Sequence, residues 1–322
     1  DRTKDVNQMI KVDLITGFLG SGKSTFLKKY ASYLIGKGEH ICILENDFGA
    51  VNVDMLLMQD LLGDHCDLEM VAGGCDKDCH KRRFKTKLIS MGMRGFDRVL
   101  IEPSGIFDVD EFFDTLREEP LDQWYEIGNV IAVVDAKLPD EMSENADYLL
   151  ASEVAGAGVI LFSKVQEATE QEIERTKAHI GRAMQRIKCD RQLADVMICK
   201  DWALLKEEDY QKIMTSGYKP ADHVKLSGEQ DGFQSVYFLN LGMTEEKMRQ
   251  TVSAVLQDAE CGKIFRVKGF IRKDDKWLEL NAMQDAMTVK EVEKGQEVLI
   301  VIGEELNEEK IRTYFGQKEL TL

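Results

Sequence analysis

The chain has 322 residues, 43% of them hydrophobic, and a formal net charge of −16. This length and apolar fraction favour about two globular domains with cores of ordinary size. The acidic balance argues against a nucleic-acid partner because like charges repel, and no apolar run approaches the ~20 residues that cross a bilayer, so we expect no membrane contact of that kind.

Segments typical of strands and helices alternate over residues 1–215. Apolar runs predict strands at Ile10–Thr16, His40–Glu45, Cys66–Val71, Arg98–Glu102, Asn129–Val134, Gly158–Phe162 and Asp195–Cys199. Helical patterns lie between them, at Thr25–Ile35, His80–Met91, Ala146–Val154 and Gln171–Ile187. This alternation predicts an α/β domain with a mostly parallel sheet covered on both faces.

A polar stretch at 216–232 contains several Gly and Pro residues and predicts a linker. Residues 233–322 then predict strands at Ser235–Leu241, Ile264–Arg272, Lys276–Leu280 and Glu297–Ile302, and helices at Thr244–Gln257 and Asn307–Phe315. We therefore expect a smaller C-terminal α+β domain, with helices on one face of an antiparallel sheet.

The first predicted strand runs into Gly-Phe-Leu-Gly-Ser-Gly-Lys-Ser-Thr at 17–25, which fits the phosphate-loop template G-x-x-x-x-G-K-[ST]. Loop amides and the start of the next helix would face an anion. Lys23 is expected to reach the β- and γ-phosphates of a nucleoside triphosphate, and Ser24 to ligate Mg²⁺. The alternative, a plain glycine-rich turn, does not require this strand–loop–helix setting. The residues expected to bind nucleotide here are Gly17, Gly20, Ser21, Gly22, Lys23, Ser24 and Thr25.

Two acidic segments follow other predicted strands. Glu102 supplies a second carboxylate for Mg²⁺, and the N–H of Gly105 is placed to sense a γ-phosphate; the alternative is an ordinary strand end before a Pro turn. Glu45, Asp47 and Asp54 follow another strand, at the sheet edge where ligands bind. We expect them to order water or a second metal, with Asp47 orienting the attacking water, and a solvated acidic loop is the alternative.

A cluster of soft ligands follows the third predicted strand. Cys75, Cys79 and His80 lie within six positions, and Cys66 is close in sequence. Thiolates and imidazole are ligands for d-block metals, so these residues and Glu45 form the predicted site for Zn²⁺, Co²⁺ or Ni²⁺. Reduced thiols without metal and a redox-sensitive thiol pair are the alternatives.

The seven cysteines are spread along the chain, and residues 1–8 carry no secretion-signal pattern. Scattered cysteines without a signal favour reduced thiols over a disulfide framework. We therefore expect a cytoplasmic protein.

Residues 163–166 are predicted to contact the base. The usual guanine-binding motif is Asn-Lys-x-Asp, whereas this chain has Ser163, Lys164 and Gln166 at the corresponding positions. Lys164 is expected to lie along the base, and the uncharged amide of Gln166 should hold guanine more weakly than a carboxylate would. GTP is the expected nucleotide, with ATP as the alternative.

Together these residues resemble the CobW/HypB/UreG family of P-loop GTPases, and its CobW-like branch most closely. The likeness is carried by the phosphate loop, by Glu-Asn-Asp-Phe-Gly at 45–49, by Glu-Pro-Ser-Gly at 102–105 and by Val-Val-Asp-Ala at 133–136. The run at 265–270, with Trp277 after it, resembles the C-terminal domain of the family. The resemblance implies a GTPase domain over 1–215 and a CobW-like domain over 233–322.

The resemblance further implies GTP hydrolysis coupled to delivery of zinc, cobalt or nickel to a client metalloprotein or cofactor enzyme, with a homodimer left open. Lys23, Asp47 and Glu102 are the expected catalytic residues. No arginine finger is evident, which predicts slow turnover. The metal loop of the family usually has the pattern Gly-Cys-x-Cys-Cys; here Cys75 matches and Cys79 is displaced by one position.

Three other functions use the same phosphate loop. A small-molecule kinase would transfer phosphate to a bound acceptor faster than to water. A nucleotide-gated binding module would activate a partner enzyme without carrying metal. A purely structural nucleotide site would hydrolyse nothing with any partner.

Overall fold

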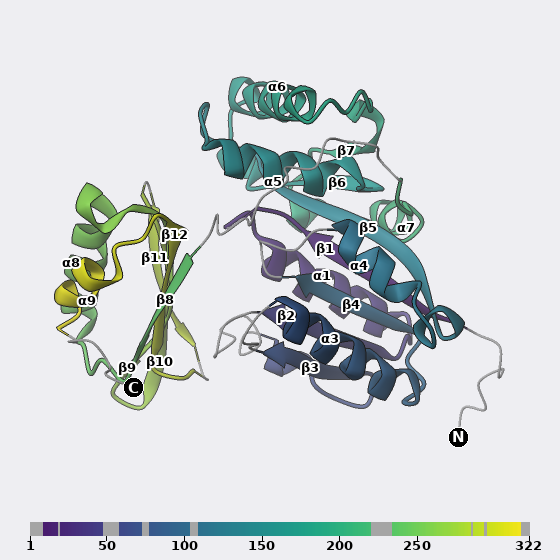
Figure 1. Ribbon diagram of the computed structural model, residues 1–322, viewed down its shortest axis with the longest axis horizontal. Helices are drawn as coiled ribbons and strands as arrows, with labels where there is room; N and C mark the ends of the chain where they lie inside the picture. Colours follow the sequence, from purple (N-terminus) through teal and green to yellow (C-terminus); the bar gives the residue numbers. More distant parts are fainter. Residues whose placement is uncertain are drawn as a thin grey trace. The chain divides into compact units, whose positions relative to one another are not determined.

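A computed structural model of the chain describes residues 9–18, 20–47, 58–72, 77–103, 109–219, 234–284, 286–292 and 295–316. The described residues divide into two compact units, one ending at 219 and the other beginning at 234 (Figure 1). Among these residues no helix is both long enough and apolar enough to cross a membrane.

The first unit is built on a seven-stranded sheet with the order β3-β2-β4-β1-β5-β6-β7. Every hydrogen-bonded pair of its strands is parallel. The strands are β1 (Ile10–Thr16), β2 (Ile41–Asp47), β3 (Cys66–Ala72), β4 (Arg98–Pro103), β5 (Tyr125–Asp135), β6 (Val159–Ser163) and β7 (Met197–Ile198). The predicted α/β class with a parallel sheet is confirmed.

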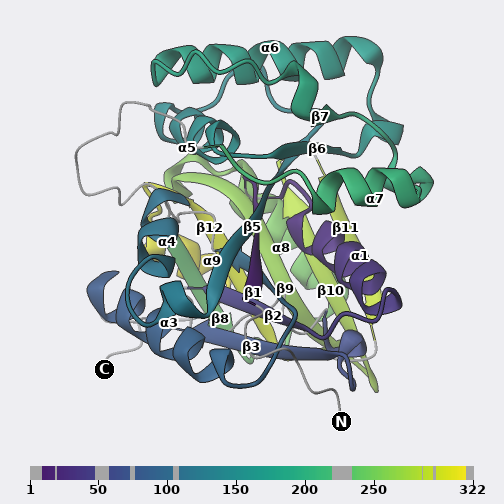
Figure 2. The ribbon, with the colours of Figure 1, turned by 90° about the vertical axis from the view of Figure 1, so that its right-hand side faces the viewer.

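Helices cover both faces of this sheet (Figure 2). They are α1 (Lys23–Gly36), α3 (Lys77–Gly92), α4 (Val109–Leu116), α5 (Glu144–Ala155), α6 (Glu170–Arg186) and α7 (Glu207–Met214). Buried residues of α3, α4, α5 and α6, such as Phe84 and Phe112, form one core with the sheet. Phe26 of α1 and Ile213 of α7 belong to a second core on the opposite face. The strands are buried on both sides, which explains their nearly continuous apolar runs.

The second unit has a five-stranded antiparallel sheet with the order β11-β10-β9-β12-β8. Its strands are β8 (Gln234–Leu239), β9 (Lys263–Lys273), β10 (Lys276–Met283), β11 (Ala286–Val292) and β12 (Val298–Glu304). Helices α8 (Glu245–Gln257) and α9 (Glu308–Tyr314) pack on one face of it, where Val252 and Ile311 join buried strand residues. The predicted α+β arrangement is confirmed.

Local sequence signals explain several helix starts. Thr169 forms a capping box with Glu172 at the start of α6, and the hydroxyls of Ser143 and Thr244 accept backbone N–H groups at the starts of α5 and α8. Each of these side chains satisfies an amide that has no partner within its own helix.

The predicted elements do not include three that the structure contains, namely α4, α7 and β11. Strand β11 is an edge strand whose residues are all exposed or half-buried. The apolar contrast that marks a strand is therefore weak there. Helices α4 and α7 have eight residues each, little more than two turns. Helix α4 nevertheless has apolar residues at helical spacing, Val109, Phe112, Phe113 and Leu116, all buried, so this pattern was present in the sequence and was missed.

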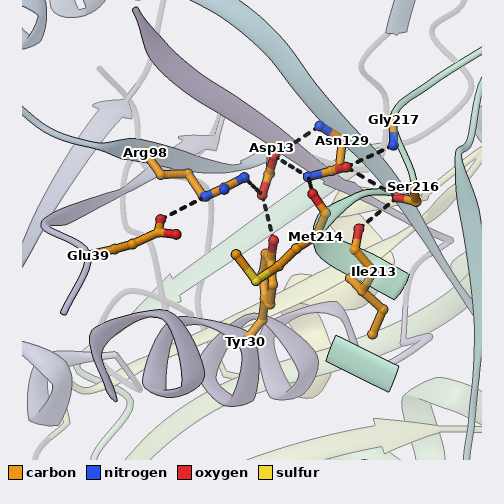
Figure 3. Close-up of polar contacts among 9 residues, drawn as sticks. All are labelled: Asp13, Tyr30, Glu39, Arg98, Asn129, Ile213, Met214, Ser216 and Gly217. Carbon is orange, nitrogen blue, oxygen red and sulfur yellow. Dashed lines mark hydrogen bonds and ion pairs between the residues drawn. The ribbon is translucent and has the colours of Figure 1, made fainter. Parts of the chain in front are cut away.

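A buried polar network joins the central strands of the first unit (Figure 3). The Asp13 carboxylate on β1 accepts hydrogen bonds from the Tyr30 hydroxyl and Arg98 Nη1, both at 2.8 Å, and from the backbone and side chain of Asn129, both at 2.9 Å. Arg98 also binds Glu39 at 2.9 Å. Burial beside Asp13 raises the pKa of Tyr30, so the phenol stays protonated and donates. The network ties β1, α1, β4 and β5 together.

The same network holds the chain segment that follows α7. The Asn129 side chain donates to the Met214 carbonyl at 3.0 Å and accepts the Gly217 N–H at 2.8 Å (Figure 3). The Gly217 carbonyl in turn accepts the Val130 N–H at 2.9 Å. A Cβ on Gly158 would lie 2.1 Å from this carbonyl, so only glycine permits the close approach.

Candidate nucleotide-binding site

The phosphate loop connects the carboxyl end of β1 to the first residue of α1. Gly22 is the N-cap of α1 with φ 98°, and Gly20 has φ 78°. Gly17 has φ 145°, and a Cβ there would lie 2.3 Å from the Val133 carbonyl oxygen. Positive φ values and this close contact explain why the loop needs glycine at these positions. Ser21 lies inside the loop, and its buried hydroxyl has no hydrogen-bond partner among the described residues.

Lys23 turns its side chain back over the loop. Its ammonium donates to the Gly17 carbonyl at 2.6 Å and to the Phe18 carbonyl at 3.4 Å, and the residue is 7% exposed. An ammonium has three N–H donors, so these two contacts leave one for a phosphate oxygen. The positive charge is thus held against the loop backbone.

Ser24 at the start of α1 contacts Glu102 at the carboxyl end of β4. The Ser24 hydroxyl donates to Glu102 Oε1 at 3.2 Å, and Glu102 is buried near the carboxyl end of β4. Glu45 on β2 is the register partner of Glu102 and is also buried. A hydroxyl and carboxylates are the hard oxygen ligands that suit Mg²⁺, so the donor set fits that ion.

Lys164 joins the loop to the end of β5. Its ammonium binds Asp135 Oδ2 at 2.5 Å and donates to the Gly20 carbonyl at 3.4 Å. Lys164 itself has φ 54°, which turns the chain sharply after β6. Ser163 is buried at the end of β6, whereas Gln166 is exposed. Of the three residues predicted to contact the base, Lys164 bonds to the loop at Gly20, and the Cβ of Ser163 lies 3.5 Å from the position of a Cβ on Gly22.

Two residues near the loop have no motif that marks them. The Trp202 ring lies 3.4 Å from the position of a Cβ on Gly22, and it meets the Phe26 ring edge-on with centroids 5.5 Å apart. Glu153 of α5 is buried and interacts with both Gly17 and Lys23. Both residues reach the loop through tertiary packing, which no local pattern predicts.

The predicted transition-metal residues fall on different parts of β3 and α3. Cys66 is buried at the amino end of β3, paired with Ile41, and burial raises the pKa of its thiol to about 12. Cys79 and His80 lie in the first turn of α3, beyond the other end of that strand. Because a seven-residue strand spans about 20 Å, Cys66 is separated from the start of α3.

Other predicted site residues lie outside the described part of the chain. Cys75, Gly105 and Asp54 belong to segments that the structure does not describe, and the same holds for the side chains of Cys79, His80 and Asp47. Asp47 is the last residue of β2, at the same sheet edge as Glu102. Within the described residues, no group of three or more His, Cys, Asp or Glu side chains is placed to hold a metal.

Comparison with known families agrees with this geometry. The model of the CobW/HypB/UreG nucleotide-binding domain matches residues 11–191, and the model of the cobalamin synthesis protein CobW C-terminal domain matches residues 242–318. The chain belongs to the CobW/HypB/UreG family. The two matched stretches correspond to the parallel-sheet unit and to the antiparallel unit.

Several curated proteins are similar to this family member. The zinc chaperone YjiA of Escherichia coli is 34% identical over 171 residues, which cover 51% of this chain and 52% of YjiA. The zinc chaperone YeiR of Escherichia coli is 28% identical over 171 residues, covering 52% of this chain and 51% of YeiR. The match therefore spans about half the length of these relatives.

Among solved structures, the Zn(II)-bound YjiA GTPase from E. coli is 25% identical in sequence, and the match covers 97% of this chain and 99% of that chain with a TM-score of 0.37. The family assignment rests on the two domain models and not on this superposition.

Proposed function

We propose that this protein is a Mg²⁺-dependent GTPase that couples GTP binding and slow hydrolysis to the delivery of a metal ion, zinc first among the candidates, to a client metalloprotein or cofactor enzyme. The observation that carries the proposal is the loop itself, in which the buried Lys23 ammonium stands beside the Ser24–Glu102 contact. Family membership and the names of the zinc chaperones YjiA and YeiR support zinc as the cargo.

The phosphate end of the nucleotide would lie in the loop between β1 and α1. Amide N–H groups of the loop and the start of α1 would donate to phosphate oxygens, and Lys23 would bind the β- and γ-phosphates. Ser24 and Glu102 would hold Mg²⁺, which neutralises charge on the phosphates when it is bound. Asp47, at the end of β2, would orient the attacking water.

The base end of the nucleotide would lie beside Lys164 and Trp202. The Lys164–Asp135 ion pair fixes the Lys164 stem next to Gly20, so the aliphatic part of the side chain would lie along a purine face. Gln166 follows Lys164 and offers an amide oxygen in place of the usual carboxylate. We therefore propose GTP as the preferred nucleotide. The preference for GTP over ATP should be smaller than in proteins that carry Asp at this position.

The cargo metal would be bound by Cys75, Cys79 and His80, which follow β3 in sequence. Strand β3, which precedes them, ends at Ala72 beside Asp47, because β2 and β3 are parallel and in register. Our proposed ligand set omits Cys66, which lies at the other end of β3. Nucleotide and metal would then bind at one edge of one sheet, which is the physical basis for coupling between them.

The test is an anaerobic titration of the metal-free full-length chain with Zn²⁺, Co²⁺ and Ni²⁺ against a competing chelator, with and without GTP or ATP. We expect GTP to change the zinc affinity by at least about fivefold, the lower end of usual coupling energies. Lys23→Ala should lose this effect, whereas Lys29→Ala, an exposed lysine on the same helix, should keep it.

Two results would refute parts of the proposal. If GTP binds but leaves the affinity for every metal unchanged, the proposed coupling of GTP to metal delivery fails. If Lys23→Ala binds GTP as tightly as the unaltered chain does, the phosphate loop is not the nucleotide site and the whole proposal fails.

A further inference from the structure

Helix α3 carries a concentration of positive charge in an otherwise acidic chain. Residues 77–94, which hold the helix and its end, contain seven Lys or Arg residues and one acidic residue, whereas the whole chain has 42 Lys and Arg against 58 Asp and Glu. The apolar side of the helix, with Phe84, Leu88 and Met91, is buried in the core of the first unit. The charged side therefore faces away from the core.

An open hollow of about 530 Å³ lies on this outer side. Its described lining consists of residues at positions i, i+1, i+4, i+5 and i+8 of the helix, which share one face, namely Arg82, Arg83, Thr86, Lys87 and Ser90. Two guanidinium groups and an ammonium are strong donors to a carboxylate, and the Ser90 hydroxyl can donate as well. No acidic side chain of the described residues lines the hollow. Its chemistry therefore suits an anion.

The carboxylates near this face lie on its flanks and are already paired. Glu118 binds Lys85 at 2.7 Å and Lys81 at 3.4 Å, so one carboxylate is shared by two ammonium groups and positive charge stays in excess on that flank. On the other flank, Glu69 binds Lys87 at 2.8 Å. Exposed pairs of this kind contribute about 1 kcal/mol or less, so an incoming carboxylate can compete for the same lysines.

The size of the hollow limits what the anion can be. Arg82 and Ser90 are eight residues apart on the helix, which is about 12 Å, the length of about four residues of extended chain. Duplex DNA carries a charge about every 1.7 Å over a much longer stretch, and it would extend over the acidic remainder of the chain, which repels it. A short peptide segment with several carboxylates matches the face without meeting that repulsion.

We propose that the outer face of α3, from Lys81 to Ser90, docks a short acidic segment of the client protein. The inference rests on the proposed function, which places the cargo metal at Cys79 and His80 in the first turn of this helix. Arg83 follows Cys79 by four residues, which is about 6 Å along the helix. A client docked here would have its own metal ligands close to the cargo, and charge pairing would select clients that carry an acidic segment.

The test is the binding of a rhodamine-labelled peptide, Asp-Glu-Gly-Asp-Glu-Gly, to the whole chain without nucleotide or metal, measured by fluorescence anisotropy. We expect binding that weakens by at least about fivefold between about 50 and 300 mM salt, because salt screens exposed charges. A peptide with Asn and Gln in place of the acids should not bind.

Variants of the chain locate the peptide. Arg82→Glu/Arg83→Glu should weaken binding by at least about tenfold, since it reverses two charges of the hollow. Ser90→Glu adds a carboxylate there without removing an arginine and should weaken binding by at least about threefold. The control is Arg175→Glu/Arg182→Glu, which makes the same change in net charge on the exposed side of α6 and should stay within about twofold. All of these variants should bind GTP as the unaltered chain does.

The outcomes separate the two proposals. No peptide binding, or equal binding by the α3 and α6 double variants, would overturn the docking surface and leave the GTPase proposal standing. Tighter binding of duplex DNA, phosphatidylserine vesicles or inorganic phosphate, lost in the same α3 variants, would overturn a protein partner. If the peptide binds at α3 but GTP leaves every metal affinity unchanged, metal delivery and the role of the client fail together. Should the α3 double variant not fold, Ser90→Glu decides the matter.

Discussion

Glu45 and Glu102 are register partners on neighbouring parallel strands, so two buried acids stand side by side next to Ser24. The sequence patterns place Glu102 in the Mg²⁺ site and Glu45 in the transition-metal site. The register sets Glu45 beside Glu102, and we propose that it serves the Mg²⁺ site. Cys66, a predicted ligand of the transition metal, lies at the opposite end of β3. Paired carboxylates with a hydroxyl form a set of oxygen ligands for a hard cation.

The first prediction concerns this oxygen cluster. Glu102→Gln should raise the Mg²⁺ concentration for half-maximal GTP hydrolysis by at least about tenfold, since it removes the charge that accepts the Ser24 hydroxyl and would hold the ion. Ser24→Ala should act in the same direction, and Ser24→Thr, which keeps the hydroxyl, should not. The measurement is phosphate release during a Mg²⁺ titration. An unchanged Mg²⁺ requirement in Glu102→Gln would contradict the assignment.

The second prediction concerns Trp202. Its ring packs against Gly22 and Phe26 at the start of α1, so a nucleotide in the loop should change its emission. We expect GTP to alter the tryptophan fluorescence of the unaltered chain, and Trp202→Phe to lose most of that change. Trp277→Phe is the control, because Trp277 lies in β10 of the second unit. If the change persists in Trp202→Phe, the nucleotide does not reach this ring.

The third prediction separates the cysteines. Burial raises the pKa of Cys66 to about 12, so its thiol stays protonated near neutral pH and is a poor metal ligand. Cys66→Ala should therefore leave the zinc affinity within about twofold, whereas Cys75→Ser should lower it by at least about tenfold. Chelator competition under anaerobic conditions measures both. An equal loss of zinc affinity in the two variants would show that Cys66 is a metal ligand after all.

The fourth prediction concerns the buried network around Asp13. Asp13→Ala leaves Arg98, which is 4% exposed, without its buried counterion. Removing one partner of a buried ion pair costs about 3–5 kcal/mol in the free energy of unfolding. Asp114→Ala breaks the exposed pair with Arg117 and should cost about 1 kcal/mol or less. Urea unfolding compares the two variants, and similar midpoints would show that the network adds no stability.

Short-range patterns predicted much of this fold. The phosphate loop between β1 and α1 follows from a motif whose glycines, Gly20 and Gly22, do adopt positive φ. The buried strands follow from apolar runs. The strand predicted at Arg98–Glu102, for example, is observed as β4 at Arg98–Pro103. What the patterns missed depends on packing between distant segments. The Trp202 ring lies against Gly22 and Phe26 through tertiary packing, and no spacing in the sequence records that contact.

The motifs predicted which residues to expect at the candidate site, but not all the contacts between their side chains. Ser24 contacts Glu102, and the Lys23 ammonium bonds to the Gly17 carbonyl; their roles in binding nucleotide and Mg²⁺ stay predictions. Asp135 belongs to a segment that the family resemblance had marked, but its role as the partner of Lys164 needs the structure. The reason is that an ion pair depends on the separation of two side chains, which sequence order does not contain.

Strand β5 has attachments near both of its ends. Toward its start, Asn129 and Val130 hold Gly217, just before the chain passes beyond residue 219 on its way to the second unit. Its last residue, Asp135, is bonded to Lys164, which touches the phosphate loop at Gly20. Strand β5 therefore links the segment at Gly217 to the phosphate loop, through backbone and side-chain hydrogen bonds at one end and the Asp135–Lys164 ion pair at the other, so that a pull on Gly217 would be felt at Gly20.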